Sequence, residues 1–123
     1  MTKVYFTKEI SSEALIRIYE KLGIELTGNV AVKLHSGEAG NQNYLRPEFL
    51  QSIIERVGGT VVECNTAYAG ERNTTAKHQK LMENHGWSKY YNVDILDSEA
   101  PDKVLDIPNG KVIKKNYVGK HID

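Results

Sequence analysis

The chain of 123 residues has one cysteine, Cys64, and no net charge. One thiol excludes an internal disulfide and a metal site built from cysteines alone. Sixteen basic residues balance sixteen acidic ones, so the charge gives no argument for nucleic acid or an anionic membrane. No apolar run approaches the roughly 18 residues of a membrane span, and no leader pattern opens the chain. From these absences we expect a cytoplasmic protein with neither nucleic acid nor membrane as partner.

Familiar nucleotide and metal motifs are also missing. Gly37, Gly40 and Gly70 form neither a dinucleotide fingerprint nor a phosphate loop ending in Gly-Lys-Ser/Thr. No two histidines have the i, i+4 spacing of a helical metal pair. We interpret His78 and His85 as histidines at the edge of the core. The sequence therefore predicts no metal site and no cofactor in this chain.

What is present is an alternation of strand and helix patterns. Strands are predicted at residues 4–6, 29–34, 60–63 and 90–96, and helices start at Ser11 or Ser12, at Pro47 and at Asn73 or Thr74. The apolar strand at 29–34 lacks strict alternation, which is typical of a strand covered on both faces. We predict a single α/β domain over residues 1–123, with three layers and a mostly parallel sheet from βαβαβαβ units.

A C-terminal β-hairpin is predicted by Pro108-Asn109-Gly110, which lies between the strand-like residues 103–107 and 111–118. Asn-Gly between such runs is the strongest short signal for a hairpin. We expect a tight turn with positive φ at Gly110. The lysines of this tail are predicted to form a solvated face.

Two long polar loops, residues 35–45 and 64–75, follow the second and third predicted strands. Such connections usually take about 2–6 residues. Because parallel strands end at one edge of a sheet, where α/β sheets bind ligands, we expect the loops to lie side by side and form a binding site. The candidate ligand-binding residues are Lys33, Gly37, Glu38, Asn43, Asn65, Tyr68, Arg72, Asn73, Thr74 and Thr75.

The charged candidates allow more than one interpretation. Lys33 either pairs with an acid such as Glu63 or points into the site. Arg72, beside the positive end of the third helix, needs a negative partner. This partner is either Glu38 or Glu71, or a bound small anion that Lys33, Asn65 and the hydroxyls of Thr74 or Thr75 would also contact. The length and polarity of the loops favour the anion.

Three functional hypotheses follow. The first is a ligand-binding module whose site needs further sequence or a partner chain. The second is an enzyme acting on a small anionic substrate, with Cys64, Lys33 and Glu38 as catalytic candidates and Arg72 as a substrate contact. The Cys64–Arg72 spacing is longer than in the cysteine enzymes that handle phosphate, and a reactive thiol would need a lowered pKa. The third is a purely structural domain.

Two groups of residues resemble a known family, namely 32–38 with 43–47, and 63–68 with 72–75, His78, His85 and Gly86. They are similar to the N-terminal half of the domain-of-unknown-function family 362, and the resemblance covers nearly the whole chain. Family members are described as iron–sulfur-binding or ferredoxin-containing proteins of anaerobic bacteria and archaea. The resemblance implies a 4Fe-4S cluster in downstream sequence, because Cys64 cannot supply four cysteine ligands.

The length of the family's members bears on domain organisation. They usually run to about twice this length or more, which amounts to a second domain. The resemblance thus implies that residues 1–123 are an N-terminal fragment of a longer protein. The expected partners are the missing C-terminal domain or further copies of the chain.

Overall fold

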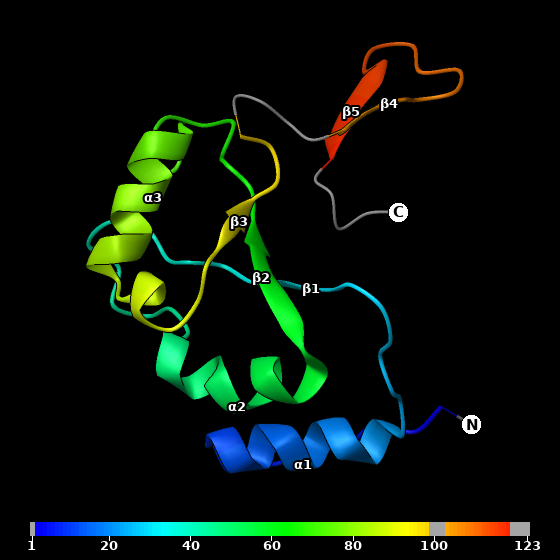
Figure 1. Cartoon of the computed structure of the whole chain (residues 1–123), viewed down its shortest axis with the longest axis vertical. Helices are drawn as coiled ribbons and strands as arrows, with labels where there is room; N and C mark the ends of the chain where they lie inside the picture. The colour runs from blue at the N-terminus through cyan, green and yellow to red at the C-terminus, as the bar shows by residue number, and fades with distance from the viewer. Residues whose placement is uncertain (1, 99–102, 119–123) are drawn as a thin grey trace.

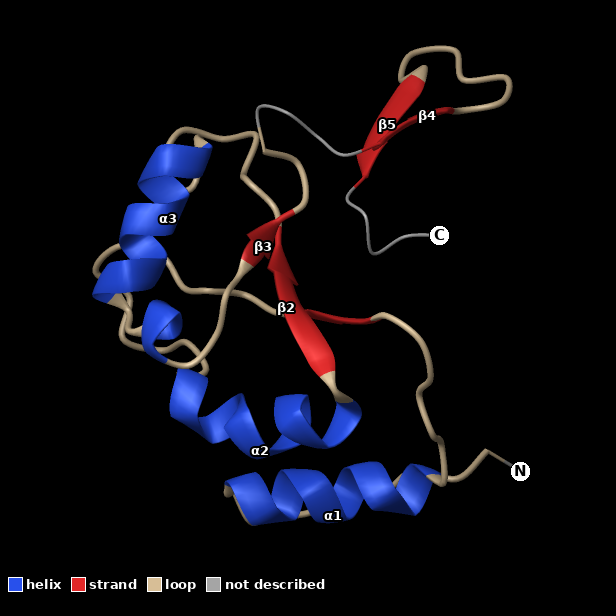
Figure 2. Ribbon diagram, viewed as in Figure 1, coloured by secondary structure: helices blue, strands red, loops and turns tan. Residues whose placement is uncertain are grey.

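The computed structural model describes residues 2–98 and 103–118, which form an α/β structure (Figures 1 and 2). A parallel sheet has the order β1-β2-β3, and an antiparallel pair joins β4 to β5. The strand bounds are β1 Val30–Lys33, β2 Gly59–Glu63, β3 Asp94–Ile95, β4 Lys103–Asp106 and β5 Lys115–Val118. In the parallel register Lys33 lies beside Val62, and Glu63 lies beside Ile95, so β2 is the central strand.

The three α-helices begin where the sequence predicts, and a short 3-10 helix that was not predicted follows the third. They are α1 (Ser12–Leu22), α2 (Pro47–Val57), α3 (Thr75–Asn84) and the short 3-10 helix η1 (Trp87–Lys89). The side chains of Ser11 and Thr74 cap α1 and α3, and Pro47 is the first residue of α2. Gly23 and Gly58 end α1 and α2 in the left-handed conformation. No helix within 2–98 or 103–118 is long and apolar enough to cross a membrane.

One hydrophobic core joins the sheet to α2, α3 and η1. Trp87 is fully buried at its centre. α1 packs along α2 at the lower end of the view in Figure 1. Burial of each leucine, isoleucine, valine or methionine side chain in this core contributes about 1.5–3 kcal/mol to stability. The core is formed by Leu34, Leu50, Ile54, Val61, Met82, Trp87 and Ile95.

The predicted first strand is wrong. Residues 4–6 have no regular secondary structure, and Val4 and Phe6 are 86% and 82% exposed. Strand propensity reflects packing against neighbours, and these side chains have little packing to favour a strand. The described sheet therefore has three parallel strands, and the three-layer βαβαβαβ arrangement is not confirmed.

Two further strands differ from expectation. The predicted strand at 90–96 shrinks to Asp94–Ile95, after η1 and an irregular segment. β1 is covered on one face only, because Val30 and Val32 are half-buried whereas Ala31 and Lys33 are exposed. The prediction that this strand is covered on both faces is therefore wrong, since its apolar composition gave no sign of the exposed face.

The C-terminal hairpin is confirmed, but its second strand is shorter than the predicted 111–118 and its turn is not the predicted one. The Ile107 N–H donates to the Lys114 carbonyl at 2.9 Å, so the connection is longer than a two-residue turn. Positive φ occurs at Asn109 (62°) and not at Gly110. Gly110 is needed for another reason, since a Cβ there would collide with the carbonyl oxygen of Ile113. Lys120 of the predicted solvated face falls outside the described residues.

The close approach of Gly110 to the carbonyl oxygen of Ile113 predicts what one added methyl group would do. We expect Gly110→Ala to open the hairpin, measured as a loss of amide hydrogen-exchange protection across β4 and β5. Gly70→Ala is the matched control, because a Cβ at Gly70 meets nothing within 4 Å. The control should be neutral or raise stability by up to about 1 kcal/mol. Unchanged protection in Gly110→Ala would contradict the packing described for this turn.

Candidate functional site

The site is centred on Glu63, the last residue of β2, whose carboxylate is buried with 1% of the residue exposed. One oxygen accepts from Lys33 Nζ at 2.8 Å and from the Cys64 N–H at 2.9 Å. The other accepts from the Ser36 N–H at 2.8 Å and lies 3.3 Å from Arg72 Nη1. Burial alone would raise the pKa of Glu63, but the hydrogen bonds from Lys33, Ser36 and Cys64 hold it below 4.5. The carboxylate is therefore ionised at neutral pH.

Arg72 connects this carboxylate to the second loop. Its guanidinium is buried and donates from Nε to Glu38 Oε1 at 2.9 Å, and Nη2 bonds the same oxygen. Nη2 also donates to the Tyr68 hydroxyl at 2.9 Å, and that hydroxyl donates to Glu38 at 2.7 Å. Hydrogen bonds from Arg72 and Tyr68 lower the pKa of Glu38. The 35–45 and 64–75 loops thus lie side by side, as predicted, and Glu38 is the negative partner of Arg72.

Ser36 links the carboxylate to the core. Its carbonyl oxygen accepts from Trp87 Nε1 at 3.0 Å and lies 2.9 Å from His85 Nδ1. Its hydroxyl lies 3.0 Å from Nε2 of His78, which is fully buried. Burial lowers the pKa of His78, which favours the neutral ring. The Ser36 hydroxyl itself donates to Glu63 Oε1 at 3.1 Å, and His78 Nδ1 lies 3.2 Å from Asn65 Oδ1, so His78 bridges Ser36 to Asn65.

A hollow opens beside this network at the N-terminus of α3. Asn65 holds two of its walls together. Its N–H donates to Asp97 Oδ1 at 2.7 Å, and its side-chain amide donates to Thr75 Oγ1 at 3.1 Å. Thr74 caps the helix. The hollow is lined by Asn65, Thr66, Ala67, Asn73, Thr74, Thr75 and Asp97.

The predicted site residues therefore divide into two neighbouring groups. Lys33, Glu38, Tyr68 and Arg72 belong to the ion-pair network around Glu63. Asn65, Asn73, Thr74 and Thr75 line the hollow.

Two predicted residues lie apart from both groups. Gly37 is buried, and a Cβ there would lie 2.8 Å from the ring of Tyr44, which stacks on His85. Asn43 is exposed and lines a separate hollow with His35 and Tyr44.

Sequence reasoning missed part of the site. Glu63 was considered only as a partner for Lys33, although an acid directly after the buried Val61-Val62 run was a usable signal. Ser36 stood inside a predicted loop without being singled out. Asp97 carried no signal, because only the fold brings the segment after β3 to Asn65.

The nucleophilic side chains of the site are poorly suited to catalysis. Burial, and then the nearby Asp97 carboxylate, raise the pKa of Cys64, which is the opposite of what a reactive thiol needs. Ser36 is fully buried and out of reach of a substrate. Within the described residues no group of three or more metal-binding side chains occurs. The single Cys64 also does not fit a four-iron cluster, which takes four cysteines.

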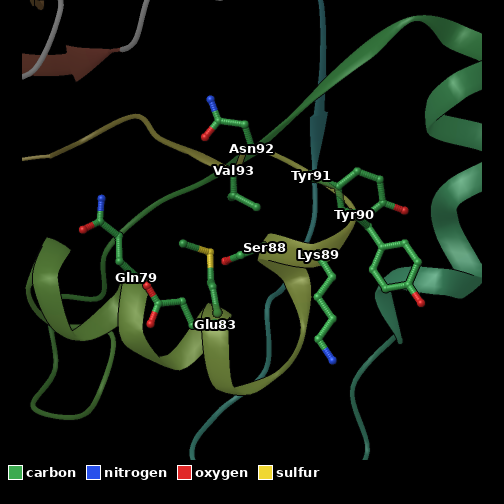
Figure 3. Close-up of a pocket in the computed structure, with 9 residues that line it drawn as sticks. Gln79, Glu83, Ser88, Lys89, Tyr90, Tyr91, Asn92 and Val93 are labelled. Carbon is green, nitrogen blue, oxygen red and sulfur yellow. The ribbon is translucent and has the colours of Figure 1, made fainter.

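A further hollow lies between α3 and residues 88–93 (Figure 3). Gln79 and Glu83 line it from α3, and Ser88, Asn92 and Val93 line it from the segment that follows this helix. None of the residues that the sequence predicts as ligand-binding lines it. It is therefore separate from the candidate site.

The buried carboxylate gives a prediction for stability. Glu63→Gln should lower the free energy of unfolding at pH 7 by about 3–5 kcal/mol, because it leaves Arg72 without its second carboxylate and Lys33 without its ion pair. Since the folded pKa lies below 4.5, this contribution is complete above pH 4.5 and is lost as the pH falls through the folded value.

Urea unfolding from pH 3 to 7 measures both effects, with Glu83→Gln as control. Glu83 forms an exposed pair with Lys80, so the control should change stability by less than about 1 kcal/mol. Equal effects of the two substitutions would contradict the central place given to Glu63.

Comparison with known proteins adds one finding. The model of the family described as Domain of unknown function (DUF362) matches residues 30–123, a range that includes β1, both polar loops and the hairpin. No curated protein and no solved structure matches the chain. The match covers most of the chain and agrees with the residues on which the resemblance was based. The chain belongs to the DUF362 family of domains of unknown function.

Proposed function

We propose that this chain is a ligand-binding α/β domain that takes a small anionic ligand at the polar site of the 35–45 and 64–75 loops. The observation that carries the proposal is the Glu63–Arg72–Glu38 network, in which Glu63 and Arg72 are buried and which links both loops at the carboxyl ends of β1 and β2. Open α/β sheets bind ligands at that edge. The hollow at the start of α3 opens there and supplies the space.

The chemistry of the hollow suits an anion on its helix side. The first N–H groups of α3 lack helical partners and carry a partial positive charge. Asn73 and Thr75 add an amide and a hydroxyl. The Thr66 N–H donates to the Arg72 carbonyl at 2.8 Å and closes the 66–72 segment on itself. Arg72 itself is occupied by two carboxylates, so it positions this loop rather than contacting the ligand.

Asp97 restricts the kind of anion. Its carboxylate lines the same hollow and would repel a negative group placed against it. A ligand that fits both sides directs its anionic group at α3 and a hydroxyl or amine toward Asp97. A phosphate monoester of a small polyol meets both requirements.

Two alternatives to ligand binding, an enzyme and a purely structural domain, can be compared with the contacts of the site. An enzyme using Cys64, Lys33 and Glu38 is disfavoured by the raised pKa of Cys64 and by the ion pairs that engage the other two. A purely structural domain is consistent with the closed network, since in the described part of the chain no buried side-chain polar atom lacks a hydrogen-bond partner. A ligand titration separates this alternative from binding.

We expect phosphate to raise the melting temperature at fixed ionic strength. At a phosphate concentration ten times its Kd, the free energy of unfolding should increase by about 1.4 kcal/mol. Glycerol phosphate should act at lower concentration, because its hydroxyls reach Asp97. Asn73→Asp should abolish both responses by placing a negative charge in the hollow, while the acid itself favours the start of α3.

Asn92→Asp, the same exchange at an exposed residue outside the hollow, should keep the responses. A melting temperature that ignores both phosphates would favour the structural domain. Equal responses of the two variants would place the anion elsewhere.

The thiol gives a separate test of the enzyme alternative. Because the pKa of Cys64 is raised from its ordinary value, the rate of alkylation by iodoacetamide should rise about tenfold for each pH unit and show no plateau up to pH 9. A rate that already reaches its plateau below pH 8 would show a lowered thiol pKa and restore the enzyme hypothesis.

A further inference from the structure

The outer edge of β1 is open. Among residues 2–98 and 103–118, β1 pairs with β2 alone and ends the sheet on that side. Alternate residues of such a strand direct their N–H and C=O groups away from the sheet, ready to pair with another strand. The opposite edge, β3, is only two residues long and offers little to a partner.

β1 also lacks the features that usually protect an edge. It contains no proline, and its only charged residue is Lys33 at its end. The Lys33 ammonium is already paired with Glu63 at 2.8 Å. The exposed Ala31 has a small side chain that leaves room for a neighbouring strand. Natural proteins commonly place lysines, prolines or bulges on edges that must stay free.

We propose that β1 is a self-association surface, on which β1 of a second copy pairs antiparallel to form a continuous six-stranded sheet. A two-fold axis perpendicular to the sheet keeps both cores on the same side, and the two registers that pair most of β1 place Ala31 or Val32 on this axis. Lys33 then lies opposite Asn29 or Ala31 of the partner subunit. Neither register brings two lysines face to face, so the edge is compatible with itself.

Pairing would affect the polar site without depending on the proposed ligand. The register centred on Ala31 places Asn29 of the partner subunit across from Lys33, at the carboxyl end of β1. The partner would then add an amide beside the Lys33–Glu63 pair. The two sites of such a dimer would lie at opposite ends of the shared strand pair.

Sedimentation equilibrium over a concentration series tests the proposal on the full chain. The wild-type protein should approach twice the chain mass of 13.9 kDa. Ala31→Lys should weaken association by about fivefold or more, because in either register the new lysine directly faces another lysine. Ala76→Lys, the same exchange at an exposed position on α3, should leave association unchanged.

Two further measurements make the result decisive. Ala31→Glu should also dissociate a dimer centred on Ala31, but it should preserve one centred on Val32, where it faces Lys33. Hydrogen exchange of wild-type β1 amides should slow as protein concentration rises, which avoids any variant that folds poorly. A monomer at all concentrations, or equal association of Ala31→Lys and Ala76→Lys, would overturn the proposal.

Discussion

The buried carboxylate of Glu63 is the constraint on which the polar half of this domain depends. Moving a carboxylate out of water has a penalty of several kcal/mol unless charges and hydrogen bonds replace the solvent. Here the replacements are Lys33 from β1, Ser36 from the following loop, and Cys64 and Arg72 from the loop after β2. Because these groups come from separate segments, the carboxylate is satisfied only when both loops are in place.

The same carboxylate connects the polar site to the hydrophobic core. Ser36 donates to Glu63 through its N–H and accepts from the fully buried Trp87 through its carbonyl oxygen. Its hydroxyl reaches His78 on α3, and His78 in turn reaches Asn65 beside the hollow. The start of α3, where the proposed ligand binds, is therefore positioned by an unbroken chain of hydrogen bonds from the end of β2.

The sequence was sufficient for features that local chemistry decides. Ser11, Pro47 and Thr74 start the three helices in the expected manner, and the parallel order of β1 and β2 brought the two polar loops together. It was insufficient where tertiary contacts decide. The strand pattern at residues 4–6 had no packing to realise it, and Gly110 is required by a clash with Ile113 rather than by its own φ.

The site shows the same division between local and tertiary information. The sequence identified Arg72 and its possible partner Glu38, but it favoured a bound anion over that pair. The structure gives Arg72 two carboxylates, which turns it from a proposed ligand contact into a group that holds the loops. Carbon-13 NMR titration of the Glu63 carboxyl tests this account most directly. The account predicts a midpoint below 4.5, with chemical-shift changes in both loops as the carboxylate is protonated. A midpoint at or above 4.5 would contradict it, because the hydrogen bonds and positive charges around Glu63 would then fail to outweigh the effect of burial on the carboxylate.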